Sequence, residues 1–171
     1  MHALTLVRQM GAYNSWVNRH IYAVCEQIPD VERKLDQGAF FGSIHRTLNH
    51  LLLTDRVWIG RLTGQLFPMR TLGDELYADF SELQRQRVVT DRIWEALLNR
   101  YAEPDLDGDL HYVSSRGEPR RYPLSHVLLH IGNHQSHHRG QVTALIQRLG
   151  YDYGDIDLLF MPVDMNQDND N

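Results

Sequence analysis

Histidines recur at a strict spacing of four in one stretch of the chain, and this row is its clearest chemical feature. The row comprises His126, His130, His134 and His138, with His137 beside the last. On an α-helix a step of four residues turns only about 40° and rises about 6 Å, so neighbouring members can converge on one point. This spacing is typical of a metal site with imidazole ligands.

A single helix supplies at most two or three of the ligands of one ion. The helical rise soon carries the next imidazole beyond the metal–nitrogen distance of roughly 2.0–2.1 Å. Another ligand must come from elsewhere in the chain, and the best candidate is His50, in the strongly helical segment Ser43–Asp55. Cys25 is the only cysteine, so the ligands must be nitrogen or oxygen. We interpret Cys25 itself as a buried small hydrophobe rather than a nucleophile.

The composition predicts one soluble globular domain. Hydrophobic residues make up 42% of the 171 residues and charged residues 23%, as in an ordinary globular chain. We expect a domain over 1–163 and a polar, flexible tail over 164–171. The sequence has neither an apolar run long enough to span a bilayer nor the plan of a signal peptide, which favours the cytoplasm and no membrane partner.

The distribution of charge argues against a nucleic-acid partner. The net charge is −5, but six acidic residues follow Arg148, the last basic one. The body of the protein is therefore near neutral, whereas phosphate binding needs a concentrated basic patch.

Apolar residues recur at spacings of three and four in four segments, which predicts an all-α fold, a four-helix bundle. We expect helices over 4–28, 43–63, 79–101 and 124–149. A small β-hairpin or extended insertion over 105–122 precedes the last long helix.

Helix-end signals and a few conspicuous side chains complete this picture. Ser43 and Asp79 are expected N-caps, the latter in a capping box with Glu82, and Gly150 suits a left-handed helix end. The segment 156–160 is expected to pack back on the body. Three tryptophans are interpreted as core or pocket-wall residues: Trp16, Trp58 and Trp94.

Two glycines, Gly132 and Gly140, lie inside the histidine-bearing helix, where each costs roughly 1 kcal/mol relative to alanine. Close approach of another backbone, or room for an ion and a substrate, would compensate for this cost. A lone histidine is usually solvated or bonded to a polar neighbour, but a row of four facing the bundle favours a ligand role, because burying unpartnered imidazoles is costly.

Two familiar metal patterns are excluded. No glutamate is followed by histidine three positions later, as di-iron bundles require, and the zincin pattern His-Glu-x-x-His is absent. The remaining pattern is a mononuclear site of three imidazoles with open coordination positions.

The segments Leu48–Trp58 and Asn133–Gln141 resemble the DinB family, and the resemblance covers nearly the whole chain. It implies a four-helix bundle whose metal is held by one histidine of the second helix and two of the fourth. By position these are His50, His134 and His138. His130 is then a rival ligand or a partner of one, and His137 a candidate proton carrier; both are candidate catalytic residues, while the role of His126 stays open.

Further polar residues near the predicted ligands have alternative roles. Asn49 and Asp55 could orient an imidazole, but Asp55 lies about 140° round the helix from His50. A salt bridge of Asp55 with Arg56 or with a neighbouring helix is at least as favourable. Arg139 could bind an anionic substrate group, or more simply pair with an acid at the surface.

The resemblance implies a metal-dependent enzyme in which one divalent ion, as a Lewis acid, activates a thiol or water. The activity would be thiol S-transferase-like or hydrolase-like, on a small-molecule substrate that can include a low-molecular-weight thiol. Zinc or nickel is the preferred ion, with iron, manganese or copper as alternatives.

The alternative is a non-catalytic stress-response metal-binding bundle whose ion is structural. A catalytic ion keeps an open position, whereas a structural ion takes a fourth protein ligand, such as His130 or a group from another chain. The fold is also compatible with a homodimer formed through exposed faces of the first helices.

Overall fold

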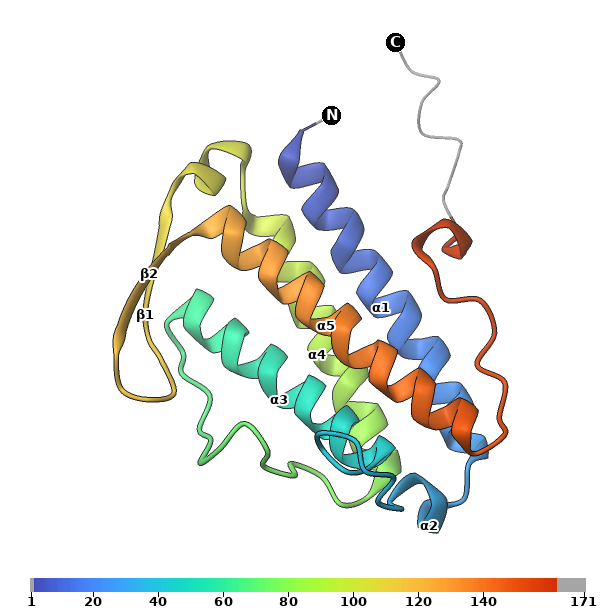
Figure 1. Ribbon diagram of the computed structural model, residues 1–171. Coiled ribbons are helices and arrows are strands. Elements are labelled where there is room, and N and C mark those ends of the chain that lie inside the picture. The colour runs from blue at the N-terminus through green and yellow to red at the C-terminus, as the bar shows by residue number, and fades with distance from the viewer. Residues whose placement is uncertain (1, 163–171) are drawn as a thin grey trace.

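The computed structural model describes residues 2–162 and confirms the all-α bundle (Figure 1). Its four long helices are α1 (Ala3–Gln27), α3 (Ile44–Thr63), α4 (Phe80–Arg100) and α5 (Leu124–Arg148). The short elements are α2 (Asp30–Arg33), η1 (Glu103–Asp107), β1 (Asp109–Val113), β2 (Pro119–Pro123) and η2 (Leu158–Phe160). The predicted tail, 164–171, lies outside the described residues, and the division at 163 stays a prediction.

Most of the helix-end predictions hold. The side chains of Ser43 and Asp79 accept hydrogen bonds from the backbone N–H groups of the third residues of α3 and α4. Gly150 has φ +85°, and the N–H groups of Gly150 and Tyr151 bond to carbonyls of the last turn of α5. The prediction that Glu82 reaches back to the backbone N–H of Asp79 is wrong. Its carboxylate instead accepts hydrogen bonds from side chains one turn further along α4.

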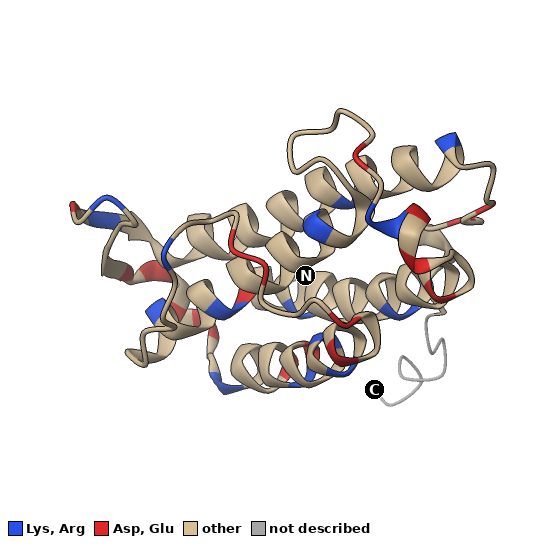
Figure 2. Ribbon diagram, turned by 90° about the horizontal axis from the view of Figure 1, so that it is seen from below, with Lys and Arg blue, Asp and Glu red and all other residues tan. Residues whose placement is uncertain are grey.

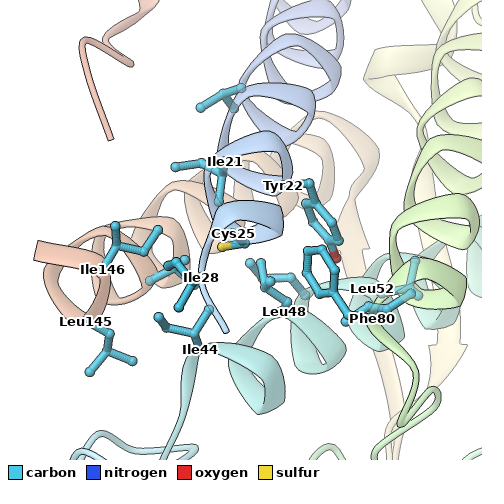
Figure 3. Packing of buried hydrophobic residues seen from close by; sticks show 14 of the residues in the cluster. Ile21, Tyr22, Cys25, Ile28, Ile44, Leu48, Leu52, Phe80, Leu145 and Ile146 are labelled. Carbon is cyan, nitrogen blue, oxygen red and sulfur yellow. The ribbon is translucent and has the colours of Figure 1, made fainter. Parts of the chain in front are cut away.

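The interior consists of two apolar clusters separated by a polar layer. The first cluster joins one end of all four long helices and includes Ile21, Cys25, Leu52 and Ile146 (Figure 3). Burial raises the pKa of the Cys25 thiol to about 12, as expected of an inert core residue. The second cluster, at the other end, is Leu4, Trp94, Leu97, Leu98, Leu106, Leu124, Val127, Leu128 and Ile131. The polar layer between them is Asn14, Asn18, Asp55, Arg87, Asp91, Gln135 and Arg139.

The tryptophans behave as predicted. Trp94 is in the second cluster, Trp16 packs against the first, and Trp58 borders both the second cluster and a surface cavity.

The prediction that another backbone approaches Gly132 and Gly140 closely is wrong. A Cβ on Gly140 would meet nothing within 4 Å, and one on Gly132 would meet only the Met10 methyl group, at 3.7 Å. The close approaches are elsewhere: a Cβ on Gly60 would lie 2.7 Å from a backbone oxygen of the following loop, and one on Gly11 2.5 Å from a leucine methyl group of α4.

The predicted hairpin is present and precedes α5. Strands β1 and β2 pair antiparallel, with Leu110 opposite Tyr122 and Tyr112 opposite Arg120. After α5 the chain returns along α1, where the Tyr13 hydroxyl donates to the Ile156 carbonyl at 2.9 Å. The packing of 156–160 is only partly as expected, since Ile156 packs on the first cluster but Leu159 is 94% exposed.

Basic and acidic residues are interspersed along the helices and loops in the view of Figure 2, rather than segregated. No described helix is long and apolar enough to cross a membrane. The partners and the compartment stay predictions.

Candidate metal centre

Three predicted ligands meet where α3 and α5 lie side by side (Figure 1). His50 comes from α3, and His134 and His138, one turn apart, come from α5. One nitrogen of each ring lies within 4.8 Å of the others, and the ring centroids are 4.5–5.2 Å apart. Among residues 2–162 these three side chains form the one such group of potential ligands, and they could hold a metal ion.

One nitrogen–nitrogen distance in the group matches the separation of two ligands of a tetrahedral ion. Nε2 of His50 and Nε2 of His134 are 3.3 Å apart. Two ligands at 2.0–2.1 Å from a tetrahedral centre are themselves separated by about 3.3 Å. Nδ1 of His50 lies 2.7 Å from the Leu72 carbonyl oxygen, which can only accept, so this nitrogen donates. The lone pair of the neutral ring is therefore on Nε2 and faces His134.

His138 is oriented in a similar way from its own helix. Its Nδ1 lies 2.8 Å from Oε1 of Gln141, an acceptor one turn further along α5. Hydrogen bonds of this kind fix the tautomer of a metal-binding imidazole and raise its basicity. Sequence reasoning passed over both partners: the Leu72 carbonyl has no sequence signal, whereas Gln141 could have been found from its spacing of three from His138.

Burial keeps the three rings neutral. It lowers the pKa of His50 to about 4 and that of His134 to about 3, and it also lowers the pKa of His138. Repulsion among the rings adds to the effect at His134, while hydrogen bonds to Leu72 and Gln141 oppose it at the other two. Because a metal binds only a neutral imidazole, the site has little competition from protons at neutral pH.

Phe41 covers one side of the centre. Its ring stacks on His50 with centroids 4.0 Å apart and lies 5.5 Å from the ring of His138. The segment that carries it contains an isolated bridge between Ala39 and Gly42, and Gly42 has φ +81°. This apolar cover was not predicted from the sequence.

Two buried hydrogen bonds from Gln135, here called the strut, join α5 to α3 beside the centre and fix the spacing of the two helices. The side-chain amide of Gln135 donates to Oδ1 of Asp55 at 2.6 Å and to the Leu51 carbonyl at 3.2 Å. Gln135 follows His134 in the chain, and Leu51 follows His50. Asp55 also pairs with Arg87 of α4 at 2.7 Å, as the neighbouring-helix interpretation expected, rather than with Arg56.

Arg139 has neither of its expected roles. Its side chain is buried, donates to Asn14 and to the Ser136 hydroxyl, and lies 5.3 Å over the Tyr13 ring. It is a core cation of the polar layer, because the helix turn carries it away from the histidine face. Asn49 likewise orients no imidazole of the centre: its amide bonds to the backbone of Tyr77 and holds the loop that follows α3.

The other histidines of the row lie outside the group of three. His130 is exposed, with its ring 6.0 Å from that of His134 and 5.5 Å from that of Trp58. His126 and His137 are also exposed, and His137 lies beside His138, with its Nε2 3.3 Å from the Gln141 amide nitrogen. The catalytic roles considered for His130 and His137 stay predictions.

The fold and the site together define a four-helix bundle with a tri-histidine centre between its second and fourth long helices. The DinB family model matches residues 1–168, and the chain belongs to this family. It is 26% identical over 156 residues to Protein DinB of Bacillus subtilis (strain 168), covering 83% of this chain and 88% of that protein. The crystal structure of a DinB-like protein from Bacillus cereus ATCC 10987 shares the fold, with a TM-score of 0.62 and 20% identity over 81% of this chain and 89% of that one.

Proposed function

We propose that the protein is a metal-dependent enzyme in which His50, His134 and His138 bind one divalent transition-metal ion, with zinc or nickel preferred. The observation that carries the proposal is the convergence of three neutral imidazoles from two helices, with two of their Nε2 atoms 3.3 Å apart. Family membership supports metal binding, and the sequence resemblance implies the same three ligands.

The donor set also favours a catalytic ion over a structural one. No fourth histidine, cysteine or carboxylate joins the three rings within residues 2–162, and three protein ligands with an open position are typical of catalytic zinc sites. When bound, such an ion acts as a Lewis acid and makes a thiol or water more acidic. The chain itself orients the imidazoles through Leu72 and Gln141 and limits solvent on one side through Phe41.

Elemental analysis of protein purified without a histidine tag tests the ligand set. We expect about one equivalent of metal in the wild type and His130→Ala, which is the matched control from the same row, and a loss of most of it in His134→Ala. Unchanged metal content in His134→Ala would reject the assignment. Equal losses in both variants would point to a different ligand set.

Two further measurements test the chemistry. A low-molecular-weight thiol added to cobalt-substituted protein should produce a sulfur-to-cobalt charge-transfer band if a coordination position is open. Thiol conjugation to small electrophiles should then depend on the metal and disappear in His134→Ala. Bound metal without either signal would favour the non-catalytic alternative.

A further inference from the structure

The surface cavity bordered by Trp58 lies one helical turn along α5 from the metal centre. Its volume is about 190 Å³, and it is bounded by α3, the β1–β2 hairpin and the first turns of α5. Its walls are formed by Trp58, Tyr112, Tyr122, His126, Val127 and His130. His130 belongs to this wall and also neighbours His134, so it connects the cavity with the centre.

The walls present several rings to one small volume. The Trp58 ring lies edge-on to Tyr112 at 5.3 Å and to His130 at 5.5 Å, while Tyr122 stacks on His126 at 5.9 Å. Such rings pack well against another planar group. A cavity of about 150 Å³ holds one benzene molecule, so this one has room for a single ring with a small substituent.

The charge beside the cavity is positive. None of the six wall residues is acidic. The Arg61 guanidinium lies 4.5 Å over the Trp58 ring and 4.6 Å over the Tyr112 ring. Its side chain makes no hydrogen bond or ion pair with any residue of 2–162, unlike Arg121 of the hairpin, which pairs with Asp109. Arg61 does not line the cavity, but it is a half-buried cation beside two of its wall residues, and no residue of 2–162 takes its hydrogen-bond donors, so they are available to an anionic ligand.

We propose that this cavity binds the planar ring of a small aromatic carboxylate, with Arg61 favouring its anionic group. The ring site stands on its own geometry. The additional step, that the cavity holds the second substrate of the metal centre with its reactive end toward His134, rests on the proposed function.

Titration of the full-length protein, with and without zinc, by benzoate, benzamide and benzyltrimethylammonium tests the site by calorimetry or ligand-observed NMR. We expect saturable benzoate binding in both forms, about tenfold tighter than benzamide, because hydrogen bonds to a charged partner are the stronger ones. Tighter binding of the cationic probe would overturn the charge assignment. Absence of benzoate binding would overturn the site.

Variants distinguish the cavity from direct binding of the carboxylate to the ion. Tyr112→Ala, or Tyr122→Ala if the first variant does not fold, should weaken both ring probes about tenfold or more. Arg61→Gln should reduce the preference for benzoate over benzamide to within about twofold, whereas Arg121→Gln, the hairpin control, should keep it. Benzoate binding that requires zinc and ignores Tyr112→Ala would refute the proposal. If the protein binds benzoate but no metal, only the proposed function fails; if it binds metal but no benzoate, only the ring site fails.

Discussion

Replacing Gln135 with leucine should weaken both the bundle and the metal centre. Gln135 is only 1% exposed, and its amide donates to the Asp55 carboxylate and to the Leu51 carbonyl. Loss of a hydrogen bond to a charged group costs about 1.5–3 kcal/mol and loss of a neutral one about 0.5–1.5 kcal/mol. The added apolar burial of leucine offsets roughly 1 kcal/mol, so we expect the free energy of unfolding to fall by about 2 kcal/mol.

Metal affinity should fall as well, because the bond from Gln135 to the Leu51 carbonyl joins the residue after His134 to the residue after His50. Removing a hydrogen-bond partner of a metal ligand typically costs about 10–100-fold in affinity. Gln135 acts on the ligands only through the helix spacing, so we expect a loss at the lower end of this range, about tenfold. Urea unfolding of the apoprotein and a competition titration with a chromophoric zinc chelator measure the two effects separately. The matched control is Gln147→Leu, an exposed position on α5. If Gln135→Leu matched this control in both measurements, the strut would have no such role; a stability loss with unchanged affinity would refute its link to the centre.

Three further predictions follow from the same contacts. Gln141→Ala should lower zinc affinity by about tenfold or more with little change in the free energy of unfolding. Gln141 is only half-buried, and its side chain bonds to His138 and His137. Chelator competition and urea unfolding measure the two effects, and unchanged zinc affinity would contradict the prediction. The pKa of His50 falls from an ordinary value near 6.5 to about 4 on folding, so the unfolded chain binds more protons between these values. The stability of the apoprotein should therefore be retained above about pH 6.5 and lost as the pH falls toward 4. When the free energy of unfolding in urea is plotted against pH, its slope over this range should be smaller in His50→Gln than in the wild type, and an identical slope would argue against His50 as the source. Gly140→Ala should stabilise α5 by up to about 1 kcal/mol because a Cβ there meets nothing within 4 Å, whereas Gly60→Ala should destabilise α3 because its Cβ would contact backbone 2.7 Å away; thermal unfolding of the pair decides, and the opposite order would refute the packing argument.

The sequence predicted what depends on local spacing. The recurrence of apolar residues located the four helices, and local capping rules correctly identified Ser43, Asp79 and Gly150. The histidine spacing predicted that His134 and His138 share a helix face. His50 was already the best candidate for the further ligand, and the family resemblance then implied the same three residues. These predictions succeeded because each depends on residues within one turn, or on a pattern shared by a whole family.

The predictions that failed depend on contacts between distant residues. Arg139 was expected at a substrate or at the surface, but its partner Asn14 lies on α1, 125 residues away in the chain. The Leu72 carbonyl, which fixes the tautomer of His50, belongs to a loop whose path no local rule predicts. Glu82 shows that even a local motif fails when its carboxylate bonds instead to competing donors on Arg85 and Gln86.

The polar layer and the metal centre share the same turns of α3 and α5. His50 and Asp55 point to different sides of α3, while His134 and Gln135, adjacent in α5, provide a candidate ligand and a buried amide. Apolar side chains alone tolerate small shifts between helices. The hydrogen bonds from Gln135 to Asp55 and Leu51, in contrast, can form only when α3 and α5 lie in one position along each other. Ligand nitrogens must be placed to within a few tenths of an ångström, so a buried polar layer beside the centre supplies precision that the two apolar clusters cannot.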